Sequence, residues 1–319
     1  MDILFITATR IGDAVLSTGL LSYLIERHPL ARLTIAAGPL PAPLFQWVPG
    51  LERIVVVNKR RFGLHWLALY AAVAPRRWDM VVDLRRSVLP WLLRSGARKM
   101  MGKRDPQQHR VRQLGRLFGL DRPPCPRLWT APHHDRAAAA EIPAGGPVLA
   151  IGPAANWRGK EWRANRFAEL AQRLTAASGM LPGARVAVLA AGHERPQAEP
   201  LLTALPEDRR IDLVGKLDLP SVAAVLRRCS MFIGNDTGLM HIAAASGTPT
   251  LGLFGPSPAE QYAPWGPRAA YVRSAQPAAT MFGPGFDHRT TGTLMDGLTV
   301  DAVEAAARGL WASAASAAA

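Results

Sequence analysis

Short apolar runs alternate with amphipathic segments along most of this 319-residue chain. In the first 140 residues, the runs typical of buried strands are 3–9, 33–38, 53–58 and 78–84. Helical periodicity at 14–27 and 63–74 separates them. Continuous apolar strands that alternate with helices predict a parallel sheet covered on both faces.

The same pattern restarts after a segment rich in proline and polar residues at 121–136 and the sequence "EIPAGGP" at 141–147. The later strands are expected at 148–154 and 184–192 and in a strand–turn–helix–strand unit at 232–257, with helices at 163–174, 219–229 and 299–311. Two such halves in series predict an α/β protein with two facing Rossmann-like domains. The expected boundaries are 1–140, 141–300, and a closing helix with an alanine-rich tail at 301–319.

Positive charge is concentrated in the first half of the chain. The net charge is +14; residues 1–140 carry 22 Lys and Arg against 9 Asp and Glu, whereas residues 141–319 carry 16 against 15. A genome whose composition favours arginine would raise the arginine content of both halves, so it does not explain this difference. The asymmetry therefore predicts an anionic partner for the first half: a nucleic acid, a membrane surface or a phosphorylated substrate.

Other features narrow the class of protein. No apolar stretch reaches the roughly 18–20 residues that a bilayer crossing needs. The start, "MDILFITATR", has no basic region ahead of an apolar core, so we expect no secretory signal. Cys125 and Cys229 form neither a disulfide framework nor a metal-ligand pattern. A reducing cytosol is the expected compartment.

Candidate chemistry lies where strands end, because ligands of open α/β sheets bind at the carboxyl ends of the strands. The turn Arg10-Ile-Gly-Asp13 follows the first strand and opens the first helix, and Gly12 allows a tight turn. Asp13 is either the helix N-cap or a carboxylate that acts as a general base. The sequence alone favours the cap.

At two strand ends in the second half, a charged residue again has two possible roles. Lys160 is either a solvated lysine or a point charge on a phosphate. Its loop is not a Walker A motif, because six residues separate Gly152 from Gly159 and Glu161 stands where Ser or Thr should follow. Glu194 either caps a helix or accepts a hydrogen bond from a ribose hydroxyl.

The turn "GNDTG" (234–238) begins a helix with small side chains. Backbone N–H groups at Thr237 and Gly238 form an expected phosphate site. Asp236 is either the N-cap or a sugar-hydroxyl acceptor, and His241 is either a core residue or a cleft residue. The sequence lacks GxGxxG, Asp-x-Asp, GxSxG and zinc-ligand spacing. We therefore expect no cofactor and no metal, with the chemistry supplied by a carboxylate, a lysine and helix N-termini.

Taken in order and spacing, these elements resemble glycosyltransferase family 9, the ADP-heptose:lipopolysaccharide heptosyltransferases. The matching blocks are "RIGDAVLST" (10–18), "GPAANWRGKEWRANRF" (152–167), "VGKLDLPSVAAVLRRC" (214–229) and "NDTGLMHIAAASGTPTLGLFGPS" (235–257). The resemblance spans about residues 3–311. It implies a metal-independent, inverting glycosyltransferase with a GT-B fold, in which the first domain binds the acceptor and the second binds the nucleotide sugar.

The resemblance also assigns roles by position. They are Asp13 as catalytic base; Arg10 and Gly12 in the acceptor-site turn; Lys160, Thr237, Gly238 and His241 at the donor diphosphate; Asp236 at the sugar; and Glu194, Lys216 and Leu217 at the nucleoside. It implies ADP-heptose as donor, an anionic lipid-linked saccharide as acceptor, and peripheral contact with the inner face of the cytoplasmic membrane. Ala155 and Asn156 replace threonines of some members, and residues 274–289 match no block. These departures allow a different donor or acceptor.

Two other function classes stay open at this point. A GT-B-like UDP-sugar 2-epimerase would share the architecture but would have little use for a basic first half. A basic nucleic-acid-binding protein would explain the charge. The basic region, however, has neither an aromatic-interleaved nor a helix-turn-helix pattern.

Overall fold

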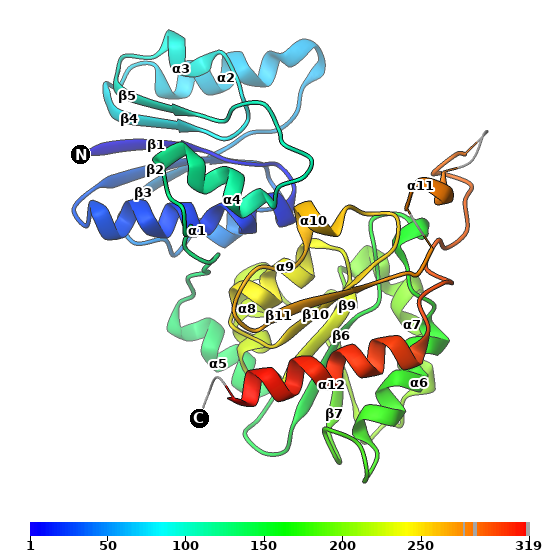
Figure 1. Ribbon diagram of the computed structural model, residues 1–319. Coiled ribbons are helices and arrows are strands. Elements are labelled where there is room, and N and C mark those ends of the chain that lie inside the picture. The colour runs from blue at the N-terminus through cyan, green and yellow to red at the C-terminus, as the bar shows by residue number, and fades with distance from the viewer. Residues whose placement is uncertain (277, 283–285, 317–319) are drawn as a thin grey trace. The chain divides into compact units, whose positions relative to one another are not determined.

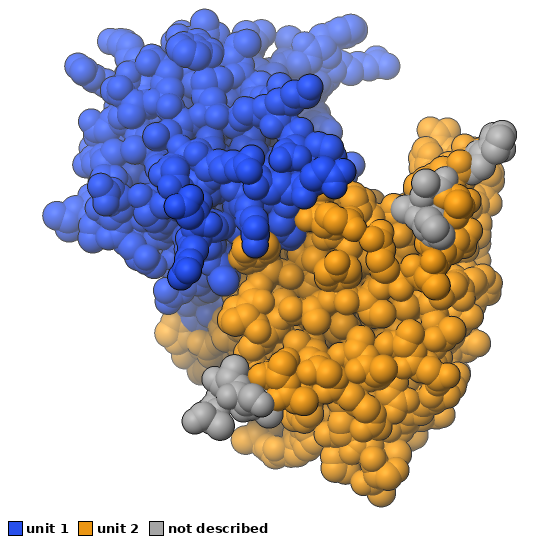
Figure 2. Space-filling view, viewed as in Figure 1, with its two compact units in different colours: residues 1–131 blue, residues 132–319 orange. Residues whose placement is uncertain are grey.

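The computed structural model describes residues 1–276, 278–282 and 286–316. The chain divides into two compact units, Met1–Ala131 (unit 1) and Pro132–Ala319 (unit 2), which Figure 2 colours separately. Each unit is an α/β fold built on its own parallel sheet. The unit boundary falls inside the proline-rich segment, and the alanine run that follows it forms a helix of unit 2.

Unit 1 contains a five-stranded sheet in the order β3-β2-β1-β4-β5, and every strand pair is parallel. Its strands are β1 (Asp2–Ile6), β2 (Arg32–Ala37), β3 (Leu51–Val56), β4 (Trp78–Asp83) and β5 (Ser95–Met100). Its helices are α1 (Ile11–Arg27), α2 (Leu64–Val73), α3 (Leu89–Leu92) and α4 (Arg110–Gly115).

Helices cover both faces of this sheet, as the apolar strands predict. Leu4 and Ile6 of β1 pack with Leu69 and Val73 of α2 in one core cluster, which also contains Leu89 of α3. Figure 1 shows α2 and α3 on this side of the sheet and α1 on the other. Helix α4 packs on α1. The carboxyl ends of all five strands therefore open at one edge, between two helical layers.

Unit 2 contains a six-stranded sheet in the order β11-β10-β9-β6-β7-β8, again with parallel pairs. Its strands are β6 (Val148–Gly152), β7 (Arg185–Val188), β8 (Arg210–Asp212), β9 (Met231–Asn235), β10 (Thr250–Phe254) and β11 (Ala269–Arg273). Its helices are α5 (Pro132–Glu141), α6 (Ala164–Thr175), α7 (Arg195–Ala204), α8 (Leu219–Arg227), α9 (Gly238–Ala245), α10 (Ala259–Tyr262), α11 (Ala278–Met281) and α12 (Val300–Ser316).

The closing helix α12 packs beside α6 (Figure 1). Phe167 and Leu170 of α6 share the main core cluster of unit 2 with Val303 and Ala307 of α12. The expected closing helix is thus confirmed, and it runs to Ser316 rather than ending near Trp311. Among the helices in the described ranges, none has both the length and the apolarity that crossing a bilayer requires.

Candidate functional site

The carboxyl edge of the unit 1 sheet begins with the turn between β1 and α1. The N-cap of α1 is Arg10, whose backbone is extended (φ −98°, ψ 143°), and no side chain caps this helix. Asp13 is the third residue of the helix, so the interpretation of Asp13 as the N-cap is wrong. Gly12 lies inside the first turn and has no positive φ, so no left-handed turn requires a glycine there. Arg10 is exposed.

One carboxylate oxygen of Asp13 is left without a partner. Oδ1 is buried and accepts no hydrogen bond from any described residue. A buried polar atom without a partner costs roughly 1–3 kcal/mol, so such atoms are uncommon in folded proteins. Asp13 therefore presents an unused hydrogen-bond acceptor at the sheet edge where ligands bind.

Asp83 organises the neighbouring strand end, a feature that the sequence analysis missed. It is the last residue of β4, lies in register beside Ile6 of β1, and is fully buried. Oδ1 accepts a hydrogen bond from the backbone N–H of Arg85 (2.7 Å). Oδ2 accepts from the backbone N–H and the hydroxyl of Ser87 (both 2.7 Å). These bonds fix the loop in which Arg86 takes a positive φ of 58°.

Arg85 is the second missed residue. Its guanidinium lies 4.8 Å from the ring centroid of Trp66 on α2, which is a cation–π contact. Its Nη1 is buried and donates no hydrogen bond to a described residue. Burial lowers the pKa of Arg85, and the Asp83 carboxylate opposes that shift. An arginine nevertheless stays charged at neutral pH, so it offers an unused donor to an anion.

In unit 2, Lys160 and Asp236 form an ion pair. Lys160 ends a 3₁₀ turn after β6, and Asp236 directly follows the adjacent strand β9. The Nζ of Lys160 lies 2.7 Å from Oδ2 of Asp236, and Asp236 is only 8% exposed. Lys160 is therefore not a solvated surface lysine. The N-cap of α9 is Thr237, so the interpretation of Asp236 as the N-cap is wrong as well.

Asn235 holds the loop that carries Lys160, a role that the sequence analysis did not assign. Its side chain is fully buried. Nδ2 donates to the carbonyl of Pro153 (2.7 Å), and Oδ1 accepts from the backbone N–H of Trp162 (3.1 Å). Trp162 is itself anchored by its indole N–H, which donates to the carbonyl of Leu298 (2.8 Å). Both ends of the loop 153–162 are thus fixed, which restricts where Lys160 lies.

Helix α9 starts immediately after Asp236. Thr237 has an extended backbone (φ −142°, ψ 174°) and its side chain makes no capping bond. The first N–H groups of a helix have no partner within it, so those of the first turn point to the edge of the sheet. His241 is buried within α9. Its burial fits packing in the core, and its role at a diphosphate stays a prediction.

The nucleoside-binding candidates lie at the ends of the next two strands. Oε2 of Glu194 accepts a hydrogen bond from the backbone N–H of Ala191 (2.8 Å), so this carboxylate caps its own turn. Gly215, with a φ of +70°, brings its backbone against Gly192, and a Cβ there would lie 2.7 Å from the Gly192 Cα. The structure thereby joins the Glu194 turn to the segment that carries Lys216, which is exposed, and Leu217, which is half-buried.

A polar bridge ties the Lys160 loop to α7. Gln197 donates from Nε2 to Oε1 of Glu161 (2.7 Å). Burial raises the pKa of Glu161; the Arg158 guanidinium opposes that rise and the Glu194 carboxylate adds to it. The strand order β9-β6-β7-β8 therefore sets the candidate donor residues in one row along the carboxyl edge of unit 2: Asp236, Lys160, Glu194 and Lys216.

Within the described ranges, no three His, Cys, Asp or Glu side chains come together as a metal-binding group. Asp13, Arg10 and Gly12 belong to unit 1, and the other predicted site residues belong to unit 2. Part of the unmatched segment 274–289, namely residues 277 and 283–285, lies outside the described residues.

Comparison with known proteins identifies relatives of this chain. The sequence model of glycosyltransferase family 9 (heptosyltransferase) matches residues 44–284. Lipopolysaccharide heptosyltransferase 1 of Pseudomonas aeruginosa is 26% identical over 303 residues, which cover 81% of this chain and 79% of that protein. Lipooligosaccharide heptosyltransferase 2 of Haemophilus influenzae is 31% identical over 131 residues, 40% of this chain and 36% of that protein.

A solved structure supports the fold. The Escherichia coli ADP-heptose lipopolysaccharide heptosyltransferase II superposes with a TM-score of 0.76 at 20% identity, and the superposition covers 98% of this chain and 99% of that one. At 20% identity, this structural similarity supports the fold alone. The predicted fold class, two α/β units with parallel sheets of the GT-B type, is confirmed.

Proposed function

The chain belongs to glycosyltransferase family 9 and is therefore a glycosyltransferase; we propose that it transfers a heptose, with inversion, from ADP-heptose to a hydroxyl of an anionic glycolipid of the lipopolysaccharide-core type. The names of its relatives support this donor and acceptor class. The observation that carries the mechanism is the buried, unpartnered Oδ1 of Asp13 at the carboxyl edge of unit 1.

In the proposed reaction, Asp13 accepts the proton of the acceptor hydroxyl. The hydroxyl oxygen then attacks the anomeric carbon of the donor from the face opposite the nucleotide. The bond between that carbon and the diphosphate oxygen breaks, and the electron pair leaves with ADP. General-base catalysis of this kind contributes about 10²–10⁴-fold to the rate.

The proposed donor site uses the row of residues along the carboxyl edge of unit 2. Lys160 and the N–H groups at Thr237–Gly238 stabilise the diphosphate as negative charge builds on the leaving group, with His241 in the same helix start. Asp236 positions the Lys160 ammonium and accepts a hydrogen bond from the sugar. Glu194, Lys216 and Leu217 contact the nucleoside. These groups supply the charge stabilisation without a metal.

The proposed acceptor site lies at the carboxyl edge of unit 1. Arg85 presents a charged group with an unused, buried donor, and Arg10 is an exposed cation directly before Asp13. Guanidinium groups suit phosphate and carboxylate because they offer paired donors. A phosphorylated or carboxylated saccharide would therefore be held with its hydroxyl near Asp13. Because the proposed acceptor is anchored in lipid, the protein would act as a peripheral membrane protein at the inner face of the cytoplasmic membrane.

The direct test incubates the purified protein with ADP-heptose and a lipid A–core acceptor. We expect release of ADP together with an acceptor that is heavier by one heptose residue, and we expect EDTA to leave the rate unchanged. An isomerised nucleotide sugar formed from donor alone would instead indicate an epimerase. Thermal-shift screening against ADP-, UDP- and GDP-sugars identifies the base, since a bound donor raises the unfolding temperature by mass action.

A further inference from the structure

Helix α2 exposes apolar side chains where a surface helix is normally polar. Its sequence, LHWLALYAAV, contains no Lys, Arg, Asp or Glu. Only Leu69 and Val73 are buried in the unit 1 core, whereas Leu64, Leu67 and Tyr70 are exposed. A helix that is apolar all round is expected to be covered on every side, in a protein core or in lipid. Within the described part of unit 1, no segment covers the outer side of α2.

The residue before this helix extends the apolar surface. Phe62 is 97% exposed. Its backbone has a φ of 53°, and Gly63 follows with a φ of 72°. A bulky residue rarely takes the left-handed conformation. This turn holds the Phe62 ring in solvent, where an aromatic side chain gains nothing from burial.

Helix α3 continues the same surface. Leu89 belongs to the core cluster that also contains Leu69 and Val73, so α2 and α3 cover the same face of the unit 1 sheet, as Figure 1 shows. Trp91 is 69% exposed. We call the exposed apolar residues of these elements the α2–α3 surface: Phe62, Leu64, Leu67, Tyr70, Val88, Trp91 and Leu92. Exposed apolar groups gathered in this way are typical of an interaction site.

Positive charge borders the α2–α3 surface. Lys59, Arg60 and Arg61 precede it, are exposed, and form no ion pair with any residue that the structure describes. No Asp or Glu occurs between Arg53 and Trp78. Arg86 and Arg94, on either side of α3, are exposed as well. The surface thus combines apolar and aromatic side chains with a border of one charge sign.

We propose that the α2–α3 surface docks the protein on an anionic lipid bilayer. In this arrangement Phe62 and Trp91 enter the headgroup layer, which Trp and other amphipathic aromatic residues prefer. Lys59, Arg60 and Arg61 contact anionic headgroups. A polar or acidic protein partner would match the charge but would leave the apolar side chains uncovered. A bilayer of anionic lipids matches both.

The surface adjoins the catalytic edge, and in this respect the inference rests on the proposed function. Lys59–Arg61 follow β3 and Arg85 follows β4, so both segments lie at the same carboxyl edge as Asp13. Docking would turn this edge of unit 1 toward the lipid. A saccharide that is anchored in the bilayer by its acyl chains would then reach Asp13 without leaving the membrane.

The test measures co-sedimentation of the full chain with two kinds of vesicle, phosphatidylcholine alone and phosphatidylcholine with about a third phosphatidylglycerol. We expect strong binding only to the anionic vesicles. The triple variant Lys59→Gln, Arg60→Gln, Arg61→Gln should bind about 100-fold more weakly, since each basic residue near such a surface favours binding several-fold. The double variant Phe62→Asn, Trp91→Ser should lose about tenfold or more. Asn tolerates the left-handed backbone at position 62.

Matched controls come from the same unit. Leu30→Ser removes a side chain that is 92% exposed but lies outside the surface, and Arg122→Gln with Arg127→Gln removes exposed charge elsewhere. These variants should bind vesicles like the parent protein. Because every substituted side chain is exposed, the unfolding temperature should stay unchanged, which separates docking from folding. Equal binding to both vesicle types, or full binding by the surface variants, would overturn the proposal.

Two further measurements separate this inference from its alternatives. If sedimentation velocity shows a dimer that Phe62→Asn, Trp91→Ser breaks, the surface is a contact between copies of this chain and the bilayer proposal is wrong. Transfer to a deacylated, soluble acceptor should survive in the surface variants and be lost in Asp13→Asn, whereas Asp13→Asn should still bind vesicles. Vesicle binding without transfer to any acceptor would leave the docking surface standing and contradict the proposed function.

Discussion

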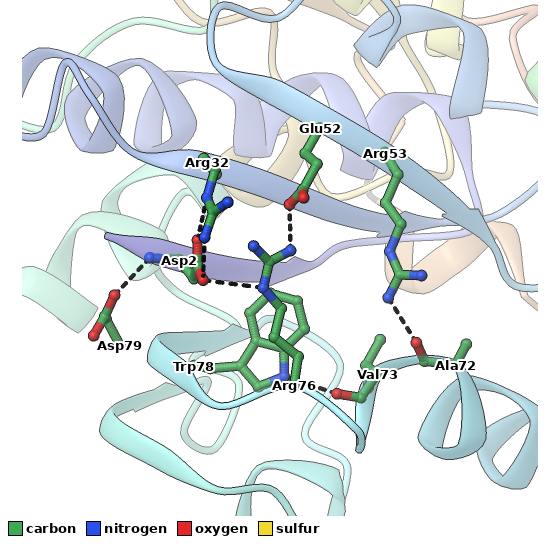
Figure 3. A network of polar contacts seen from close by, with 9 residues as sticks. All are labelled: Asp2, Arg32, Glu52, Arg53, Ala72, Val73, Arg76, Trp78 and Asp79. Carbon is green, nitrogen blue, oxygen red and sulfur yellow. Dashed lines mark hydrogen bonds and ion pairs between the residues drawn. The ribbon is translucent and has the colours of Figure 1, made fainter.

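Arginines at the amino edge and at the carboxyl edge of the unit 1 sheet differ in their ion pairs. At the amino edge, Arg32 and Arg76 form ion pairs with carboxylates (Figure 3), whereas Arg77 and Arg94, which directly precede β4 and β5, form none with a described residue. Asp2 accepts hydrogen bonds from Arg32 (Nε, 2.8 Å) and from Arg76 (Nε, 3.0 Å), and Arg76 also pairs with Glu52. At the carboxyl edge, Arg10, Arg85 and Arg86 form no ion pair with a described residue.

This difference in ion pairing indicates which positive side chains are available to bind an anionic ligand. Exposed ion pairs add little stability, about 0–1 kcal/mol each, so the main effect of the pairs at the amino edge is to neutralise Arg32 and Arg76. Unpaired cations on one edge repel each other and stabilise nothing within the chain. The unpaired Lys and Arg side chains at the carboxyl edge are available to a ligand, because ligands of open parallel sheets bind at that edge. Net charge alone would not have distinguished the two edges.

The largest effect should come from Asp13, whose Oδ1 lacks a partner among the described residues. Asp13→Asn keeps the size of the side chain and removes the base. We expect turnover to fall by about 10²–10⁴-fold, the range for loss of a general base. Donor binding should change little, because Asp13 lies in unit 1. Steady-state transfer rates, with donor affinity from calorimetry, check both statements.

The matched control lies at the opposite edge. Asp79 is also a carboxylate of this sheet, and its Oδ2 accepts a hydrogen bond from the backbone N–H of Asp2 (2.6 Å). Asp79→Asn should leave turnover unchanged. If Asp13→Asn retained the parent rate, the buried Oδ1 would have no catalytic role and the two edges would not differ in chemistry.

The second largest effect should come from Lys160, which lies at the carboxyl edge of unit 2 but forms an ion pair there. Lys160→Ala removes the partner of Asp236 in unit 2. We expect ADP-heptose to bind about 10–100-fold more weakly, the range for a charge-assisted hydrogen bond, and turnover to fall as well. Lys99→Ala, in unit 1, is the control and should bind donor normally. Unchanged donor affinity in Lys160→Ala would mean that the pair with Asp236 is structural only.

A smaller effect should separate binding from stability at Arg85. Arg85→Met keeps an apolar stem against Trp66 and removes the unpaired guanidinium. We expect KM for the acceptor to rise about tenfold, the value of a hydrogen bond to a charged group. The free energy of unfolding should change little, because loss of the cation–π contact with Trp66 is offset by removal of the buried Nη1 that donates no hydrogen bond.

Arg76→Met at the amino edge should behave in the opposite way. It removes the contacts to Asp2 and Glu52, so the free energy of unfolding should fall slightly while the acceptor KM stays constant. Acceptor KM and urea unfolding, measured on both variants, form one comparison. If both arginines affected only stability, Arg85 would not contact the acceptor.

Much of this fold follows from local sequence pattern. The central strands, the helices α1, α2, α6, α8, α9 and α12, and the position of Asp13 after the first strand could be predicted, since burial on both faces gives continuous apolar runs. Strands β5, β8 and β11 were missed; each forms a sheet edge and is only partly buried. The pattern of alternation therefore identifies central strands better than edge strands.

The side-chain geometry of the site depends on contacts between distant segments. Lys160 and Asp236 are 76 residues apart and meet only because β6 and β9 are neighbours. The segment "DLRRS", which starts at the last residue of β4, resembles a solvated charged turn, and only the fold shows that Asp83 is buried and that Arg85 lies on Trp66. Charged residues directly after a buried strand were the available signal for both.

The smallest expected effect is the acid sensitivity of the amino edge. The hydrogen bond from Arg32, together with the Arg76 guanidinium, holds the pKa of Asp2 below its usual value, although burial opposes this. The unfolded chain then binds more protons near pH ~4, so the contribution of Asp2 is present at neutral pH and is lost as the pH falls through its folded pKa. Asp2→Asn should lower the free energy of unfolding by about 1 kcal/mol or less at neutral pH and weaken its acid dependence. Urea unfolding at pH ~6 and pH ~3 measures this change. The acceptor KM and the turnover should not change, and a shift in either would show that the amino edge also takes part in binding.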